Sequence, residues 1–151
     1  MSEIIQLNSQ ANLSEHFKLG EMTKSSSHPE VYNIPSHEAI ANLKRVCEWL
    51  EVLRERYGGP IIINSGYRSP QLNRKIGGVA TSNHLTGCAV DIRVTGMEQL
   101  IRYAAILLDY ADESHQDFDE LLIEKNRYGA IWLHFAVRPR ENRCKFLYIN
   151  A

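Results

Sequence analysis

The sequence predicts an α+β fold, in which a small, mainly antiparallel sheet carries a site on one face and has helices packed on the other. Two segments, 36–57 and 97–109, carry apolar residues at helical spacing. Several shorter segments alternate between apolar and other residues, which is typical of strands with one buried face. The chain has 151 residues, of which 44% are hydrophobic, so we expect one domain over 1–151. The polar segment 1–16 is predicted to be loose.

Composition excludes several classes of partner. The formal net charge is −1, which argues against a nucleic acid or an anionic membrane. No apolar run approaches the ~20 residues that cross a bilayer, and the start of the chain lacks the basic and apolar regions of a secretory signal. The cysteines are odd in number and without paired spacing, which indicates reduced thiols in a protein made in the cytoplasm: Cys47, Cys88 and Cys144.

The first long helix is predicted over 36–57. Ser36 suits its N-cap, and Glu38 lies in the first turn, where a negative charge is favoured by the helix dipole. Gly58 and its neighbours Gly59 and Pro60 end it. Its buried stripe recurs at three- and four-residue steps: Ile40, Leu43, Cys47, Leu50 and Leu53. A shorter helical turn over 17–22 is expected to pack on the body.

A short apolar strand is predicted next, over 60–64. Ser69 then caps a brief helix with Pro70 at its first position, and the glycine pair 77–78 ends it. Arg68 is therefore held between a strand end and a helix start. From the residues alone, it is either a surface ion-pair partner or a side chain that faces a binding cleft.

Two alternating strands carry the residues with most chemistry, over 88–94 and 130–137. Period two places Asp91 on the face opposite the apolar side chains of the first strand, and places His134 likewise on the second. His84 lies just before the first strand. If the two strands share a sheet, these side chains meet on its open face. Two imidazoles, one carboxylate and a vacant fourth position make a catalytic zinc site.

The second strand is one arm of a predicted β-hairpin, whose other arm is 120–124 and whose loop is 125–129. The helix over 97–109 precedes it, followed by a polar segment over 111–117. The tail has mixed charge, and 146–149 is a candidate for a short edge strand.

The motif S-x-H-x-x-G-x-A-x-D over 82–91, followed by W-x-H over 132–134, resembles the zinc D-alanyl-D-alanine carboxypeptidases, which cleave peptidoglycan stem peptides. Hedgehog signalling domains share their fold and ligand set. The stretches 65–70 and 118–124 add to the likeness, which extends over about 17–137. It looks closest to the compact single-domain members that bacterial viruses and prophages often carry.

The resemblance leaves the catalytic base open between two residues. Many carboxypeptidase members place an acidic residue three positions before the second histidine, where this chain has Ile131. In compact members the acidic residue ends the preceding strand instead, and Glu124 fits that place. Glu120 shares its strand face and is the reserve candidate, because sequence does not fix the register of a hairpin.

The resemblance implies a zinc-dependent peptidase acting on peptidoglycan peptides, with Arg68 facing the substrate cleft. A guanidinium there suits a carboxylate or a carbonyl of a peptide. Without a secretory signal, we expect such an enzyme to reach the cell wall on lysis. The alternative is an inactive, zinc-stabilised domain that binds wall peptides or a protein, and a metal-free α/β interaction domain is a third interpretation. The bond cleaved, carboxypeptidase or endopeptidase action, and the oligomeric state stay open.

Overall fold

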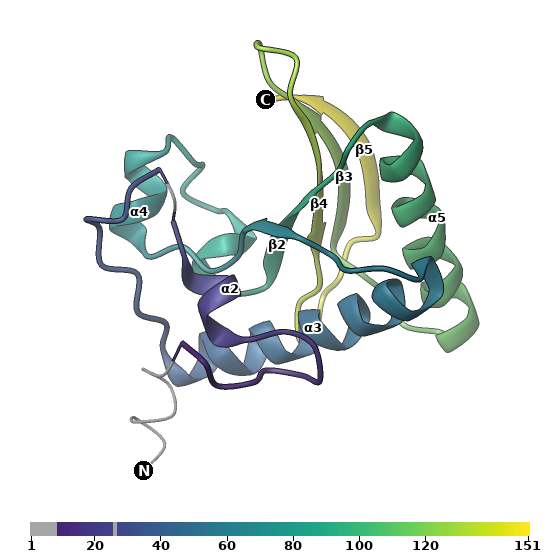
Figure 1. The fold of residues 1–151 in the computed structure, drawn as a ribbon, viewed down its shortest axis with the longest axis horizontal. Helices are drawn as coiled ribbons and strands as arrows, with labels where there is room; N and C mark the ends of the chain where they lie inside the picture. The colour runs from purple at the N-terminus through teal and green to yellow at the C-terminus, as the bar shows by residue number, and fades with distance from the viewer. Residues whose placement is uncertain (1–8, 26) are drawn as a thin grey trace.

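The computed structural model describes residues 9–25 and 27–151 and confirms the predicted fold class (Figure 1). A five-stranded sheet has the order β1-β2-β4-β3-β5, and all neighbours are antiparallel except β3 and β5. The elements are α2 (Leu19–Thr23), α3 (His37–Tyr57), β1 (Ile63–Ser65), α4 (Pro70–Lys75), the 3₁₀ helix η1 (Asn83–Thr86), β2 (Ala89–Arg93), α5 (Met97–Ser114), β3 (Glu120–Lys125), β4 (Ile131–Ala136) and β5 (Lys145–Asn150).

The helices α3 and α5 pack on one face of the sheet. As predicted, α3 follows the Ser36 cap, whose side chain accepts a hydrogen bond from the Ala39 backbone. Helix α5 ends at Ser114 rather than at residue 109. The additional turn holds Tyr110, which meets Trp49 of α3 edge-on with ring centroids 5.0 Å apart. This aromatic contact with α3 stabilises the last turn of α5, whose other residues are mostly polar.

The sheet has one apolar face and one open face. Side chains that point to the helices are fully buried: Val90, Ile92, Leu121, Leu133 and Phe135. Burying each such leucine or phenylalanine stabilises the fold by roughly 1.5–3 kcal/mol. Asp91 and His134 alternate with them and lie on the other face. The predicted assignment of faces is confirmed for both strands.

The strand ends differ slightly from the predicted ones. The first strand covers Ile63–Ser65 rather than 60–64, and its register with β2 shifts between Ile63 and Ser65. The Ile62 carbonyl still accepts a hydrogen bond from the Arg93 N–H of β2. The predicted hairpin is confirmed as β3 and β4. The candidate edge strand of the tail is β5, which pairs in parallel with β3 and forms the last strand of the sheet.

The segment before α2 is hydrogen-bonded to the rest of the chain from residue 9 onward, since the carbonyls of Ser9 and Ala11 accept from Gly20 and Leu19. Residues 1–8 of the predicted loose segment lie outside the described residues. Asn12 pairs with Lys18, Leu13 is buried, and Ser14 and His16 bind Glu51 of α3. Within the segment 1–16, which is predicted to be loose, residues 9–16 thus make hydrogen bonds or packing contacts. In the described part of the chain, no helix is long and apolar enough to cross a membrane.

Candidate metal centre

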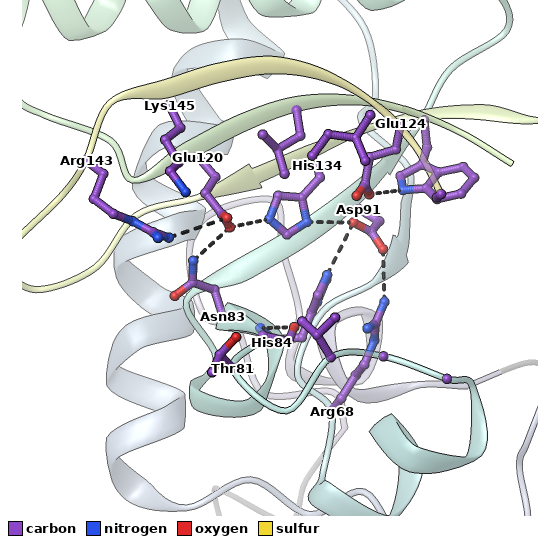
Figure 2. A pocket seen from close by; sticks show the side chains of 18 of the residues that line it. Arg68, Thr81, Asn83, His84, Asp91, Glu120, Glu124, His134, Arg143 and Lys145 are labelled. Atoms are coloured by element: carbon purple, nitrogen blue, oxygen red, sulfur yellow. Dashed lines mark hydrogen bonds and ion pairs between the residues drawn. The ribbon is translucent and has the colours of Figure 1, made fainter.

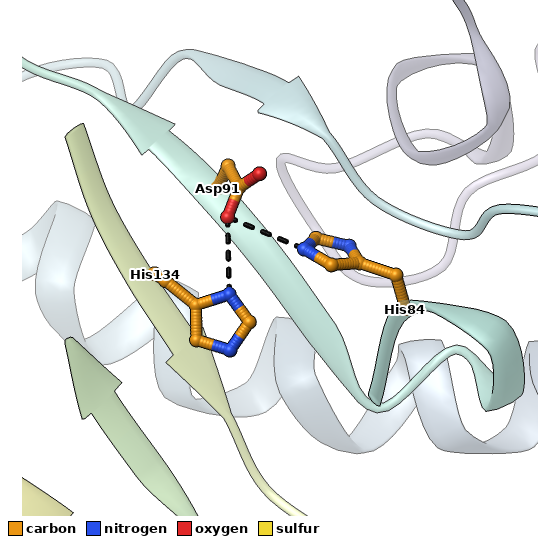
Figure 3. A group of neighbouring side chains, drawn as sticks. All are labelled: His84, Asp91 and His134. Atoms are coloured by element: carbon orange, nitrogen blue, oxygen red, sulfur yellow. Dashed lines mark hydrogen bonds and ion pairs between the residues drawn. The ribbon is translucent and has the colours of Figure 1, made fainter. Parts of the chain in front are cut away.

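Three elements bring His84, Asp91 and His134 together (Figure 3). His84 lies in η1, which is capped by the Ser82 hydroxyl, and Gly87 turns the chain from η1 into β2 with a φ of 77°. A Cβ at Gly87 would overlap the backbone of α3, so both its conformation and its surroundings require glycine. Asp91 and His134 are direct partners in the pairing of β2 with β4. The structure thus assembles the three residues as the sequence predicts.

Their ligand atoms converge on one point. His84 Nε2 lies 3.2 Å and His134 Nδ1 lies 3.1 Å from the same oxygen, Asp91 Oδ1. The three side chains offer ligand atoms that all lie within 4.8 Å of one another. All three residues are buried. Two imidazole nitrogens and one carboxylate oxygen are a donor set that suits zinc.

The outer nitrogen of each imidazole is held by an acceptor. His84 Nδ1 donates to the Gly66 carbonyl at 2.6 Å, and His134 Nε2 donates to Glu120 Oε1 at 2.9 Å. Because these acceptors fix where each ring carries its proton, His84 Nε2 and His134 Nδ1 are left to bind a cation. Such outer contacts are typical of metal-binding histidines.

The charges of the cluster also favour a cation. Burial lowers the pKa of His84. Burial also lowers that of His134, but its hydrogen bonds to Asp91 and Glu120 outweigh burial and raise its pKa to about 10. Burial would raise the pKa of Asp91, yet the two histidines hold it well below its usual range. The Arg68 guanidinium lies 3.1 Å from Asp91 Oδ2, and a histidine proton or a bound metal ion would supply the positive charge beside Oδ1.

Glu124 lies near the cluster without binding it. It is the direct partner of Trp132 across the hairpin, and the indole Nε1 donates to Glu124 Oε1 at 2.6 Å. Burial and the negative charge of Asp91 raise the pKa of Glu124. Among the described residues, no hydrogen bond or ion pair involves its second oxygen, Oε2.

Glu120 is committed to other partners. Besides His134, it accepts a hydrogen bond from Asn83 at 2.8 Å, and Arg143 lies 3.4 Å from its Oε2. Burial would raise the pKa of Glu120, but the His134 hydrogen bond and charge lower it. Its geometry is that of a residue that orients His134.

Arg68 is partly buried, and its ion pair is with the buried Asp91 of the pocket rather than with a surface residue. Its Nη2 donates to Asp91 Oδ2 at 3.1 Å, its Nε to Ser65 at 3.1 Å, and its Nη1 to Asn73 at 3.3 Å. Burial is the main effect on its pKa, which it lowers. A guanidinium has five N–H groups, so these three contacts leave two for another partner. Arg68 both braces Asp91 and lines the pocket.

A family model described as Peptidase M15 matches residues 15–118. The chain belongs to this family. The part matched to the M15 model includes His84 and Asp91 and ends before Glu124 and His134. No curated protein matches the chain. Membership of M15 supports a metallopeptidase and implies a peptide substrate.

In this M15 member, the cluster opens into a pocket of about 630 Å³ (Figure 2). Both glutamates of β3, Arg68 and Trp132 line it. Other residues of the pocket were not predicted from the sequence: Asn83, Arg138, Arg143 and Lys145. Asn83 precedes His84 in the motif, and this position could have indicated from the sequence that it lies near the site. The three basic residues come from an aperiodic segment, so only the folded chain shows that they reach the site.

Proposed function

We propose that this protein is a zinc-dependent peptidase that hydrolyses peptide bonds in peptidoglycan stem peptides or cross-links. The observation that carries the proposal is the convergence of His84 Nε2, Asp91 Oδ1 and His134 Nδ1 at a pocket that also holds Glu124. Membership of the M15 family supports it. We also expect the enzyme to act on the wall after release by lysis.

The proposed metal ligands are His84, Asp91 and His134. Three protein ligands leave one zinc position for water or substrate, and zinc in such a site acts as a Lewis acid and acidifies a water molecule. The buried Asp91 carboxylate supplies the negative charge, and Arg68 fixes its other oxygen. The outer hydrogen bonds of both rings keep the binding nitrogens aimed at one point.

Glu124 is the proposed acid and base. Its Oε1 is held by the Trp132 indole, so its Oε2 is the atom that takes the proton of the attacking water and passes it to the leaving amine. A carboxylate suits both steps when its pKa lies nearer to the working pH than that of an ordinary glutamate. Burial moves the pKa of Glu124 in that direction. Ile131, which stands where many carboxypeptidases have the acid, faces the core.

Arg68 is the proposed substrate-binding residue. Its two remaining N–H groups would bind a carboxylate or a carbonyl of the peptide, while its contact with Asp91 keeps the guanidinium in place. The substrate group would thus be held close to the metal ligands.

The test is hydrolysis of purified peptidoglycan fragments by zinc-loaded protein, with and without a chelator, followed by mass analysis of the new termini. We expect new termini that vanish with the chelator and return with added zinc. The termini also distinguish a carboxypeptidase from an endopeptidase. Fragments left intact by protein that contains one zinc per chain would contradict the proposal and favour a zinc-stabilised binding domain.

A further inference from the structure

Basic side chains line one end of the pocket, beyond His134 as seen from Arg68 (Figure 2). Arg138 follows β4, Arg143 precedes β5, and Lys145 is the first residue of β5. We call these three residues the cationic wall. The proposed roles of the metal ligands and of Glu124 do not require these basic residues.

A buried carboxylate fixes the two arginines of the cationic wall. Asp119 is fully buried and accepts hydrogen bonds from Arg143 Nε at 2.9 Å and Nη2 at 2.6 Å. Arg138 Nε lies 3.3 Å from the same carboxylate and donates to Asn83 at 2.9 Å. These contacts hold the pKa of Asp119 at about 2, although burial opposes them. Because the guanidinium groups are already positioned, a ligand need not order them, which favours binding.

The cationic wall retains unused donors. None of the contacts above involves Arg143 Nη1 or the Nη atoms of Arg138. Lys145 lies beside Glu120 in the strand register, and its ammonium has no polar partner among the residues that the structure describes. Asp119 pairs with both arginines, and Glu120 is shared between His134 and Arg143. Among the described residues no carboxylate forms an ion pair with Lys145, so a carboxylate of a ligand would complement its charge.

We propose that the cationic wall binds an internal carboxylate of the substrate, so that the enzyme prefers acidic peptides. This inference rests on the proposed function. Lys145 makes the principal contact and the unused N–H groups of Arg138 and Arg143 assist it. Since Arg68 lies toward the other end of the pocket, the substrate has acidic or carbonyl groups bound on both sides of the metal ligands. The cationic wall thereby determines which bond of the peptide lies at the metal ligands, in addition to the affinity for the peptide.

The test compares two stem peptides of L-alanine, γ-linked D-glutamate, L-lysine and two D-alanines. They differ only in whether the internal α-carboxyl of D-glutamate is free or amidated. We expect kcat/KM to be about tenfold or more higher for the free acid, which is the usual effect of a charged hydrogen bond. Replacing Lys145→Gln should bring this ratio close to one. Lys125→Gln is the matched control, because Lys125 is an exposed lysine of β3 that lies outside the pocket, and it should retain the ratio.

Equal kcat/KM for the two peptides with the unmodified enzyme would overturn the inference while leaving the peptidase proposal intact. An unchanged ratio in Lys145→Gln would also overturn it. If neither peptide is hydrolysed, calorimetric titration of zinc-loaded protein decides the question separately. Tighter binding of the free acid that is lost in Lys145→Gln would support the cationic wall although the peptidase proposal had failed, and equal binding would refute both.

Discussion

Glu120 and Glu124 lie on the same face of β3, with Leu122 between them on that face. Their carboxylates nevertheless have opposite surroundings. Glu120 accepts hydrogen bonds from His134 and Asn83, and its pKa is lowered. Glu124 has the Trp132 indole and a nearby negative charge, and its pKa is raised. Neighbouring carboxyl groups with pKa values moved apart often divide catalytic roles. We therefore propose proton transfer for Glu124 and the orientation of His134 for Glu120.

The largest expected effect comes from Glu124→Gln, which removes the proton acceptor with little change in shape. Turnover should fall by roughly 10²–10⁴, the usual contribution of general acid–base catalysis. Zinc content and melting temperature should stay unchanged, because the hydrogen bond of Glu124 is to Trp132 and not to a proposed metal ligand. Steady-state kinetics, metal analysis and thermal denaturation check the three statements. Full activity in this variant would exclude Glu124 as the base.

A smaller effect, of another kind, is expected for Glu120→Gln. The amide keeps an acceptor for His134 but loses the charge that supports it. Zinc affinity should fall by about 10–100-fold, as for other outer partners of metal-binding histidines. Chelator competition measures this affinity. Excess zinc should restore turnover. A loss of turnover that zinc does not repair would reverse the two roles.

Arg68→Lys tests whether the Glu124 end of the pocket binds substrate. A point charge replaces a fork that can hold two oxygens, so binding of a peptide with a free terminal carboxylate should weaken by about 1–3 kcal/mol. A peptide amidated at its C-terminus is the control and should lose less. An equal loss for both peptides, together with weaker zinc binding, would restrict Arg68 to bracing Asp91.

The smallest expected effect belongs to Trp132→Phe, which removes the indole N–H and keeps an aromatic ring. Turnover should fall about two- to tenfold, the usual net worth of one hydrogen bond. That hydrogen bond lowers the pKa of Glu124, so its loss raises the pKa further. Glu124 acts as a base only when deprotonated, and the acid limb of the pH–rate profile should therefore move to higher pH. If the acid limb of the pH–rate profile did not move, Trp132 would have no influence on the pKa of the catalytic base.

Local pattern predicts most of the fold and the centre of the site. Period two is enough to place Asp91 and His134 on the open face, and the pairing of β2 with β4 makes them direct partners. The end of α5 was not predictable in the same way. Its last turn is polar, and it is the distant contact of Tyr110 with Trp49 that distinguishes it from a loop.

The surroundings of the two glutamates depend on long-range pairing. From the sequence, Glu124 is preferred by resemblance and Glu120 is kept in reserve, because both have the same residue type and the same strand face. Only the hairpin register places Glu124 opposite Trp132. The buried Asp119 holds Arg143 near Glu120 by a hydrogen bond. Arg143 comes from a segment of the sequence that has no periodic pattern. Contacts of that kind have no local signature in the sequence.

The parallel pairing of β5 with β3 brings Ala151 to the rim of the pocket, where its backbone N–H donates to the Lys125 carbonyl at 2.7 Å. Whatever is attached after Ala151, an affinity tag or further chain, therefore starts beside the pocket. A fusion at that end would compete with peptides for access. Assays of hydrolysis are best made with material labelled at the other end of the chain.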